Sequence, residues 1–385
     1  MDARIDGLVN DVQSGALSRR KFFERAGALG VGTGAALALL NEPADAARRR
    51  RRRRRAAAAN GDVAPKKWRK GRGWGWVWGS DDEVGALNEL SPELAKKGLS
   101  YGKGRVYDLG QAYDKRSFKF AGHAAGEIVT YRSPEGLILQ KDPVVTGPGN
   151  TSVTSYASCL NSISDNVATQ IDGLGHIYIG REPRAYNGFK SEDIVGDYGL
   201  LKLGVETIPP IVVPATLIDV AGYLKRDPAL PAGFDIGVDL IRETLAHQKV
   251  DVDVLDAVFI RTGTGKVWLA GDKVGADQEE MKKYDPAGIT VAAARWLVEE
   301  KGALLVGSDT TGLEVVPPVD QVPGEGTSFN PVHVYLLVKQ GVHIGEVLNL
   351  EDLAKDNVYK FGLVWSPNKI KGNVAGTVQR PVALA

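Results

Sequence analysis

The feature that most constrains the fold is an alternation of short apolar runs with helical segments in the second half of the chain. Runs such as IVVPATLIDV, DAVFIRTG and ALLVGSD are bounded by turn residues, which is typical of buried strands. Between the extended runs lie three segments with helical spacing: GFDIGVDLIRETLAHQ, DPAGITVAAARWLVEEKG and NLEDLAKD. Strands that alternate with helices predict an α/β or α+β sheet protein. Further strands are predicted at RVYDLGQAY, NVATQID, PVHVYLLV and KFGLVWSP.

Two helix starts are marked by proline. Ser91-Pro92-Glu93 places an N-cap, a proline at the first helical position and an acidic first turn in order. Asp285-Pro286 is expected to start a second helix, which ends at Gly302. Both helix starts are therefore predicted from capping chemistry.

Composition excludes several classes of protein. The chain has 385 residues, is 43% hydrophobic and 25% charged, and carries a net charge of +1, but eight arginines lie in the run 48–55, so the rest sums to −7. A nucleic-acid-binding protein would be expected to spread basic residues over its folded body. Because the basic excess lies in one flanking run, we expect no nucleic-acid partner. The single cysteine, Cys159, excludes intrachain disulfides and CxxC zinc sites. No apolar run reaches the roughly 20 residues needed to span a bilayer.

The N-terminal residues have the pattern of an export signal. Arg19-Arg20 precede a weakly apolar stretch, Ala26–Leu40, and small residues follow at Ala44–Ala46. This order predicts a twin-arginine signal at residues 1–46 and a periplasmic or extracellular protein. The alternative is an amphipathic helix with an incidental arginine pair, but the stretch lacks a polar face. An Arg/Ala-rich disordered linker at 47–67 and a folded domain at 68–385 are expected to follow.

The segment NVATQIDGLGH carries four side chains with oxygen or nitrogen donors. Asn166, Gln170, Asp172 and His176 lie at offsets 0, +4, +6 and +10. In an extended chain an even spacing puts side chains on one face, so this is either a metal and acid/base site or the polar face of an ordinary strand.

A second histidine and carboxylate pair follows further along the chain. His333 precedes Glu346 by 13 residues. Such a pair alone is more often structural, but with Asp172 and His176 it completes a set able to bind a metal and perform acid/base chemistry. His343 is expected at a surface position of a strand. No GxSxG motif is present, which argues against a serine hydrolase.

Several motifs, in order, resemble the cyclase family of metal-dependent hydrolases, which includes bacterial kynurenine formamidase, isatin hydrolase and trans-dienelactone hydrolase. The similarity is to its larger members with a TQxD motif. It implies one compact α/β domain, with a β-barrel-like mixed sheet surrounded by helices, that usually forms a homodimer or homotetramer. The motifs are WGSDDEVGALNELSPE, VYDLG, TQIDGLGH, LIDVAGY, FIRTG, GITVAAARWLVEEKGALLVGSDTTGLEVVP, NPVHVYLLVKQGVHIGEVLNLEDL and RPVAL.

The resemblance also implies roles for the site residues. Such families use an HxxTHxDxxxH-like motif, in which two histidines and the aspartate bind zinc or manganese and the last histidine transfers protons. Asp172 matches the aspartate ligand and His176 the catalytic histidine, while His333 and Glu346 match a second pair near the metal. Asn166 and Gln170 occupy the positions of the two histidine ligands. Since amide oxygens are weaker zinc ligands than imidazole, the implied cofactor is manganese, magnesium or zinc, or the metal has been lost.

The resulting hypothesis is an exported hydrolase of a small amide, formamide, lactam or lactone. Metal-activated water would attack, His176 would transfer protons, and His333 and Glu346 would orient the water. The tryptophans at 74, 76 and 78 either line a site for an aromatic substrate or pack in the core or an interface. The alternatives are a metal-free hydrolase that uses Asp172 and His176, and an exported small-molecule-binding protein that kept the fold but lost catalysis.

Overall fold

The computed structural model describes residues 63–114, 117–120, 122–124, 126–268 and 278–385, and seven separate positions before residue 26. The chain divides into two units, Met1–Asp62 and Val63–Ala385, and the fold described below belongs to the second. The expected export signal, 1–46, and the first part of the expected linker lie almost entirely outside the described residues. Among the described residues, no helix has the length and apolar character to cross a membrane.

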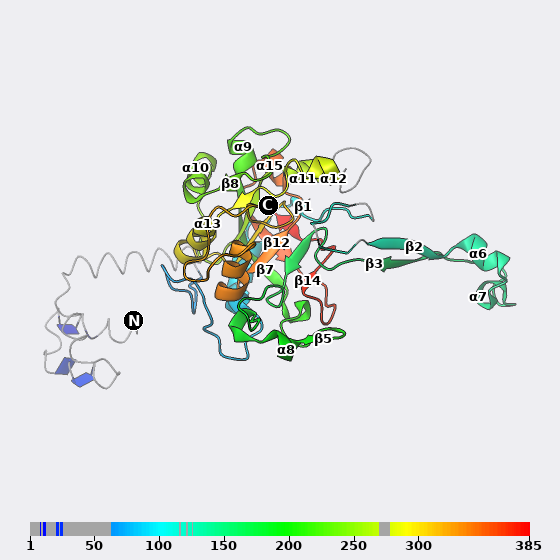
Figure 1. The fold of residues 1–385 in the computed structure, drawn as a ribbon, viewed down its shortest axis with the longest axis horizontal. Coiled ribbons are helices and arrows are strands. Elements are labelled where there is room, and N and C mark those ends of the chain that lie inside the picture. The colour runs from blue at the N-terminus through cyan, green and yellow to red at the C-terminus, as the bar shows by residue number, and fades with distance from the viewer. Residues whose placement is uncertain are drawn as a thin grey trace. The chain divides into compact units, whose positions relative to one another are not determined.

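A nine-stranded mixed sheet forms the centre of the unit Val63–Ala385, in the order β1-β15-β13-β7-β9-β11-β12-β4-β14. The strands β7, β9, β11 and β12 are parallel, and the strands that flank them pair antiparallel. The sheet curls into a half-barrel flanked by helices (Figure 1), which confirms the predicted fold class. The strands are β1 (Val106–Asp108), β4 (Gln170–Asp172), β7 (Ile211–Asp219), β9 (Ala257–Arg261), β11 (Leu305–Ser308), β12 (His343–Glu346), β13 (Lys360–Trp365), β14 (Ala375–Gly376) and β15 (Val382–Leu384).

Helical crossovers connect the parallel strands, as parallel pairing requires. Helices α9 (Val220–Tyr223) and α10 (Val238–Gln248) lie between β7 and β9 in the chain, and α13 (Val291–Arg295) with the π-helix η4 (Trp296–Glu300) between β9 and β11. Helix α14 (Pro331–His333) and the π-helix η5 (Val334–Gln340) lie between β11 and β12. The other elements of the body are η1 (Gly85–Glu89), α5 (Pro92–Leu99), η2 (Tyr186–Gly188), α8 (Ser191–Ile194), β5 (Val195–Gly196), β6 (Gly199–Leu200), η3 (Val205–Thr207), β8 (Asp235–Ile236), α11 (Thr264–Trp268), α12 (Gln278–Met281), β10 (Gly288–Ile289) and α15 (Glu351–Lys355).

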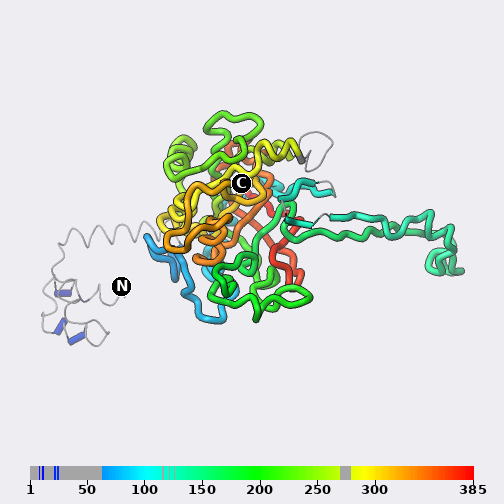
Figure 2. Tube along the Cα trace, viewed as in Figure 1, coloured from blue at the N-terminus to red at the C-terminus, as the bar shows by residue number. Residues whose placement is uncertain are grey.

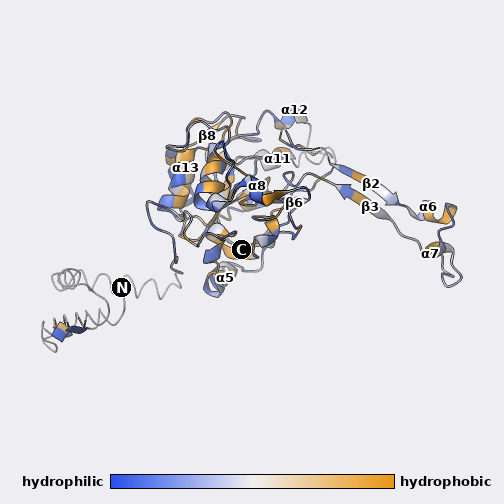
Figure 3. Cartoon of the chain, turned by 60° about the horizontal axis from the view of Figure 1, so that its bottom comes forward, coloured by the Kyte–Doolittle hydropathy of each residue, from blue (hydrophilic) through white to orange (hydrophobic). Residues whose placement is uncertain are grey.

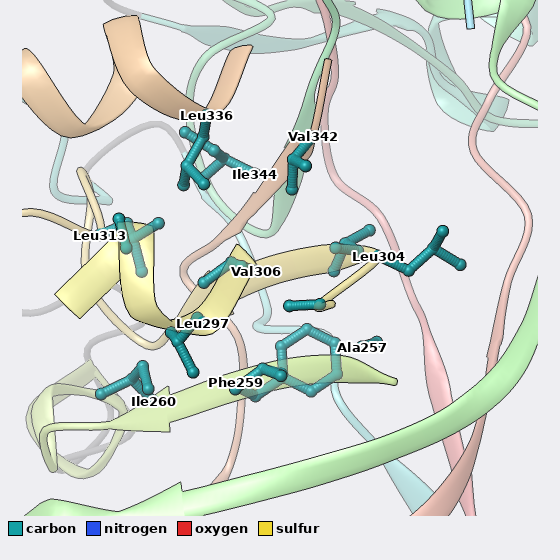
Figure 4. Packing of buried hydrophobic residues seen from close by; sticks show 14 of the residues in the cluster. Ala257, Phe259, Ile260, Leu297, Leu304, Val306, Leu313, Leu336, Val342 and Ile344 are labelled. Carbon is teal, nitrogen blue, oxygen red and sulfur yellow. The ribbon is translucent and has the colours of Figure 1, made fainter. Parts of the chain in front are cut away.

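Aliphatic and aromatic side chains of the central strands and crossover helices form the main core. Figure 4 shows part of it, with Phe259 and Val306 of two adjacent strands near Leu297 and Leu336 of the helices. The ring of Phe259 stacks on that of Phe361 at a centroid distance of 6.1 Å. These strands are buried on both faces, which explains why they appear in the sequence as continuous apolar runs.

Capping chemistry predicted one helix start and missed another. The Ser91 hydroxyl accepts a hydrogen bond from the Leu94 amide at 3.1 Å, which confirms the N-cap of α5. The second predicted start, Asp285-Pro286, is wrong, because α13 begins at Val291 behind an N-cap at Thr290. The short strand β10 occupies the intervening residues.

Two other expectations are wrong. The run PVHVYLLV, 331–338, is helical rather than extended, because it forms α14 and the start of η5. His343 is buried rather than on the surface, since β12 lies inside the sheet between β11 and β4. Its Nδ1 lies 2.8 Å from the carbonyl oxygen of Asp172.

A long hairpin projects from the body, and we call residues 127–162 the arm. It consists of β2 (Glu127–Arg132) and β3 (Ser158–Ser162), joined through α6 (Pro134–Leu139) and α7 (Pro143–Thr146). Figure 2 shows the two chain segments running out together from the body and turning at the far end.

Candidate functional site

Two antiparallel strands bring the first site residues together. Gln170 of β4 pairs with Glu346 of β12, and Asp172 pairs with Ile344. Gln170 and Asp172 share one face because they are two residues apart in a strand. The strand is shorter than NVATQID predicted, since Ala168 has a positive φ of 56° and turns the chain just before it. Asn166 still reaches the site through this turn.

The side chain of Gln170 joins the two carboxylates. Its Nε2 donates to Asp172 Oδ1 at 3.1 Å and to Glu346 Oε2 at 2.8 Å. Asn166 Nδ2 also lies 3.4 Å from Asp172 Oδ1. Two buried oxygens, Gln170 Oε1 and Asp172 Oδ2, have no hydrogen-bond partner among the described residues. Buried oxygens normally have partners, so this pair indicates space for another group.

His333 completes the cluster from the end of α14. Its Nε2 lies 3.3 Å from Glu346 Oε1 and 3.6 Å from Asp172 Oδ2. The other ring nitrogen, Nδ1, lies 2.5 Å from Glu314 Oε1. All four of these side chains are nearly inaccessible to solvent: His333, Asp172, Glu346 and Glu314. The π-helix η5 starts immediately after His333, and such irregular helices are frequent at functional sites.

Glu314 holds both the ring and the backbone of this helix end. Its carboxylate accepts hydrogen bonds from the amides of Val332 at 2.9 Å and His333 at 3.1 Å. Glu314 therefore caps α14, whose own N-cap, Asn330, makes no side-chain cap bond. Glu314 is not predicted from the sequence, because it lies 19 residues upstream of His333 in a loop and no spacing rule connects the two.

The electrostatics of the cluster follow from its excess of buried carboxylates. Burial, together with the charge of Glu346, raises the pKa of Asp172 to about 7. Burial disfavours the charged form of His333, but its hydrogen bonds to Glu314 and Glu346 outweigh burial and raise its pKa. The ion pairs found for these three carboxylates, among the described residues, are all with His333.

His176 lies at the exposed side of the cluster. Its ring centroid is 6.1 Å from that of His333, and it is half-buried. A tight turn places it there, in which the His176 amide donates to the Gly173 carbonyl at 3.1 Å. A side chain at Gly173 would approach the Val374 carbonyl oxygen to 2.7 Å. Burial lowers the pKa of His176 more than the charge of Asp172 raises it, and the charges of His333 and His123 lower it further. His123, which no motif in the sequence connects to the site, is thus one of the charged groups that act on His176.

The donor set fits a divalent cation. One potential ligand atom each from Asp172, His176 and His333 lie within 4.8 Å of one another. Glu346 and the free oxygen of Gln170 adjoin this set. Carboxylate and amide oxygens with imidazole suit manganese, magnesium or zinc. The structure thus brings together the residues predicted for the site, while their individual roles stay predictions.

A cavity of about 490 Å³ lies beside His176. Its walls include Tyr178, Ile179, Phe329 and Val334. The Tyr178 hydroxyl is buried and has no hydrogen-bond partner among the described residues. A mainly apolar cavity with a few free polar groups is typical of a small-molecule site. Tyr178 is not predicted from the sequence, because no motif includes it.

The tryptophan-rich segment packs on the body. Trp74 is buried, stacks on Trp78 at a centroid distance of 6.0 Å, and donates through Nε1 to the Ala303 carbonyl at 3.0 Å. Trp76 donates to the carbonyl of Val338 at 2.7 Å. These contacts favour the packing interpretation of this segment.

Comparisons with known proteins agree with this architecture. The model of the Cyclase family matches residues 107–315. A crystal structure described as a novel cyclase is 27% identical, with a TM-score of 0.66 over 80% of this chain and 98% of that chain. Isatin hydrolase A from Ralstonia solanacearum is 19% identical, with a TM-score of 0.49 over 76% of this chain and 95% of that chain. A protein described as a predicted metal-dependent hydrolase from Bacillus stearothermophilus is 18% identical, with a TM-score of 0.41 over 72% and 97%. No curated protein matches the sequence.

Proposed function

Since the chain belongs to the Cyclase family, we propose that it is a hydrolase of a small amide, formamide, lactam or lactone. One observation carries this proposal: the buried set of Asp172, Glu346 and His333 has a free oxygen on Asp172 and lies next to His176, which lines a cavity. Such a set can serve hydrolysis at a carbonyl group, because it combines acid/base groups with room for a cation and a substrate.

We assign a divalent cation, such as manganese, magnesium or zinc, to Asp172, His333 and Glu346. Gln170 Oε1 is the fourth candidate ligand, because it is buried without a partner. When bound, such a cation lowers the pKa of water and polarises a carbonyl group. The chain's own contribution is to hold the two carboxylates together through Gln170 Nε2 and to aim the ring of His333 through Glu314.

His176 is the proton carrier in this proposal. Because burial lowers its pKa, the ring is neutral at pH 7 and has a free nitrogen that can accept a proton. It can take that proton from the attacking water and return it to the leaving nitrogen or oxygen. Its place on the cavity wall brings it next to bound substrate.

The cavity favours a compact, partly aromatic substrate. Its volume lies within the roughly 300–1,000 Å³ that is usual for small-molecule sites. Phe329 and Ile179 offer apolar surface for a ring, and the Tyr178 hydroxyl can bond a polar substituent. The tryptophans do not enter this proposal.

The test combines metal analysis with a substrate panel. Purified protein should contain a divalent metal by elemental analysis and should hydrolyse a member of a panel of N-formyl aromatic amines, lactams and lactones. Asp172→Ala should lose both metal and activity, whereas Asp239→Asn, at an exposed position of α10, should keep both. Activity that survives in metal-free protein would support a metal-free hydrolase that uses Asp172 and His176. Ligand binding without turnover would support a binding protein.

We also propose export through the twin-arginine route to the periplasm or the cell exterior. The support is the sequence around Arg19-Arg20. Replacement of both arginines by lysine should leave the chain in the cytoplasm of its host. Export of that variant at an unchanged rate would contradict the proposal.

A further inference from the structure

Asn330 stands at the N-cap position of α14, but its side chain does not cap the helix. The amides of Val332 and His333, which an N-cap side chain would normally bind, donate to the carboxylate of Glu314 instead. No hydrogen bond to the side-chain amide of Asn330 is found among the residues that the structure describes. Its oxygen and its N–H donors can therefore bind another group.

The position of Asn330 connects the cavity with the buried cluster. Asn330 lines the cavity beside His176. Its carbonyl oxygen accepts a hydrogen bond from the Val334 amide at 3.1 Å, so it belongs to the first turn of the helix that carries His333. Val334 lines the same cavity, as expected for residues four apart on one helix face. Asn330 thus shares its cavity with the proposed proton carrier and its helix with a proposed metal ligand.

The loop that precedes Asn330 is held by paired amide groups. The Ser328 amide donates to Gln321 Oε1 at 2.8 Å, and Gln321 Nε2 donates to the Ser328 carbonyl at 3.1 Å. The Ser328 hydroxyl in turn accepts a hydrogen bond from the Asn330 amide at 3.2 Å. These bonds fix the backbone of Asn330, which reduces the entropy lost when a ligand binds.

The cavity wall suits an uncharged polar group. Uncharged polar side chains line it together with apolar ones: Tyr178, Gln321, Thr327, Ser328 and Asn330. Glu325 is the only acidic residue among the described lining residues, and it pairs with Lys339 at 2.5 Å. A carboxylate would have to leave water for neutral groups on this wall, which is costly, whereas an uncharged amide would not.

We infer that Asn330 is a specificity-determining residue that binds an uncharged amide group in the non-reacting part of the substrate. This role rests on the proposed hydrolase function and adds the chemistry of the group that the cavity recognises. The asparagine side chain presents a C=O acceptor beside N–H donors, and a substrate amide presents the complementary pair. An ester of similar shape can only accept, and a carboxylate adds a charge. Asn330 therefore selects the amide, because a polar site rejects a ligand that leaves its groups unpaired.

The test compares three formanilides that differ in one ring substituent: a carboxamide, a methyl ester and a carboxylate. The reacting formamide bond is the same in all three, so differences in kcat/KM report recognition of the substituent. The wild type should favour the carboxamide over the ester by roughly 10-fold, the effect of about one hydrogen bond, and should use the carboxylate least. Asn330→Ala should reduce the ratio of carboxamide to ester to about one, mainly through a higher KM for the carboxamide.

A second variant separates recognition from damage to the loop. Asn330→Asp keeps the shape and the acceptor of the side chain but removes its donors, so the ester loses its hydrogen bond while the carboxamide keeps one. The ratio of carboxamide to ester should therefore rise above the wild-type value. The matched control is Gln140→Ala, which removes an exposed side-chain amide at the end of α6, in the arm that projects from the body (Figure 3). This control should keep the wild-type ratio.

Failure of this role and failure of the proposed function give different results. If the wild type hydrolyses the formanilides but uses carboxamide and ester equally, or if Asn330→Ala keeps the preference, Asn330 does not select the substrate. If no formanilide is hydrolysed, the proposed function loses support, and NMR titration with benzamide and methyl benzoate measures recognition alone. Benzamide should then bind the wild type roughly 10-fold more tightly than methyl benzoate, and Asn330→Ala should abolish the difference. Equal binding of the two by the wild type would overturn the assignment of Asn330.

Discussion

Two buried ionic clusters lie in the same sheet, and they are built in opposite ways. In the first, Arg261 of β9 lies between Asp219 of β7 and Glu351 of α15, with N···O distances of 2.7–2.9 Å. In the second, Asp172 of β4 and Glu346 of β12 lie in neighbouring strands, and among the described residues only His333 forms ion pairs with them. The first cluster pairs its charges, whereas the second leaves buried oxygens free. Burial of charge is therefore common to both clusters, and the free oxygens distinguish the candidate site from the Arg261 cluster.

The contacts of the Arg261 cluster account for its charged residues without a functional role. Asp219 and Arg261 are opposite each other in the register of β7 and β9, and Asp219 also accepts a hydrogen bond from the Gly222 amide at 2.9 Å to cap α9. Arg261 uses three nitrogens on two carboxylates. Bidentate pairing of this kind compensates the cost of burying charge, and the cluster needs no ligand.

The largest expected effect is that replacing aspartate by asparagine changes the free energy of unfolding differently in the two clusters. Asp219→Asn should lower the free energy of unfolding by about 3 kcal/mol, because breaking a buried ion pair leaves Arg261 short of a partner. Asp172→Asn in metal-free protein should lower it little or raise it, since the substitution removes a carboxylate whose ionised form is costly. Urea unfolding with chelator present measures both. Equal losses of unfolding free energy would show that both clusters consist of charges that stabilise the fold.

The next prediction separates the two possible roles of His176. His176→Asn should reduce kcat by at least about 100-fold if the ring transfers protons, while bound metal stays at the wild-type stoichiometry. Because His176 also lies within ligand reach of Asp172 and His333, the alternative outcome is loss of the metal. Elemental analysis of the purified variant decides between a proton carrier and a ligand. Wild-type activity would exclude both roles.

Sequence patterns predicted the part of the sheet that holds the Arg261 cluster better than the part that holds Asp172 and Glu346. The strands β7, β9, β11 and β13 appear as long apolar runs because both of their faces are buried. The run 331–338 is apolar for the same reason, but it is helical, and periodicity cannot separate a buried helix from a buried strand. Asn330-Pro331 is a helix-start signal that would have corrected this interpretation.

Even spacing grouped side chains that the structure also brings together, but for an incomplete reason. Only Gln170 and Asp172 share a strand face, while turns bring Asn166 and His176 to the cluster. Glu314 and Tyr178 could not be found by spacing, since each meets the site through a loop whose path depends on tertiary packing.

Glu314 gives a smaller and more specific prediction. Glu314→Gln should weaken metal binding by about 10–100-fold, because partners that orient a ligand histidine typically have effects of this size. Calorimetric titration measures the affinity, and nitrogen NMR of the His333 ring should show a changed tautomer. The matched control is Glu300→Gln, which pairs with the exposed Lys70 outside the cavity lining. Unchanged affinity and an unchanged ring signal would reduce Glu314 to a helix cap.

The smallest effect is a pH dependence of stability that arises from Asp285, a buried carboxyl group with Glu346 among its electrostatic neighbours. Burial raises the pKa of Asp285 to about 7 despite hydrogen bonds from Thr311, and the charge of Glu346 adds to the rise. The unfolded chain has a pKa of about 3.9 for this group, so between about pH 4 and 7 the folded protein holds a proton that the unfolded chain has lost. Stability should therefore fall as pH rises through this window and stay level above it. Urea unfolding of metal-free protein at pH 5 and pH 8 should give a smaller difference for Asp285→Asn than for the wild type. An equal difference would mean that the proton lies on another group, with Asp172 the first candidate, because its pKa is raised to about 7 by the same burial.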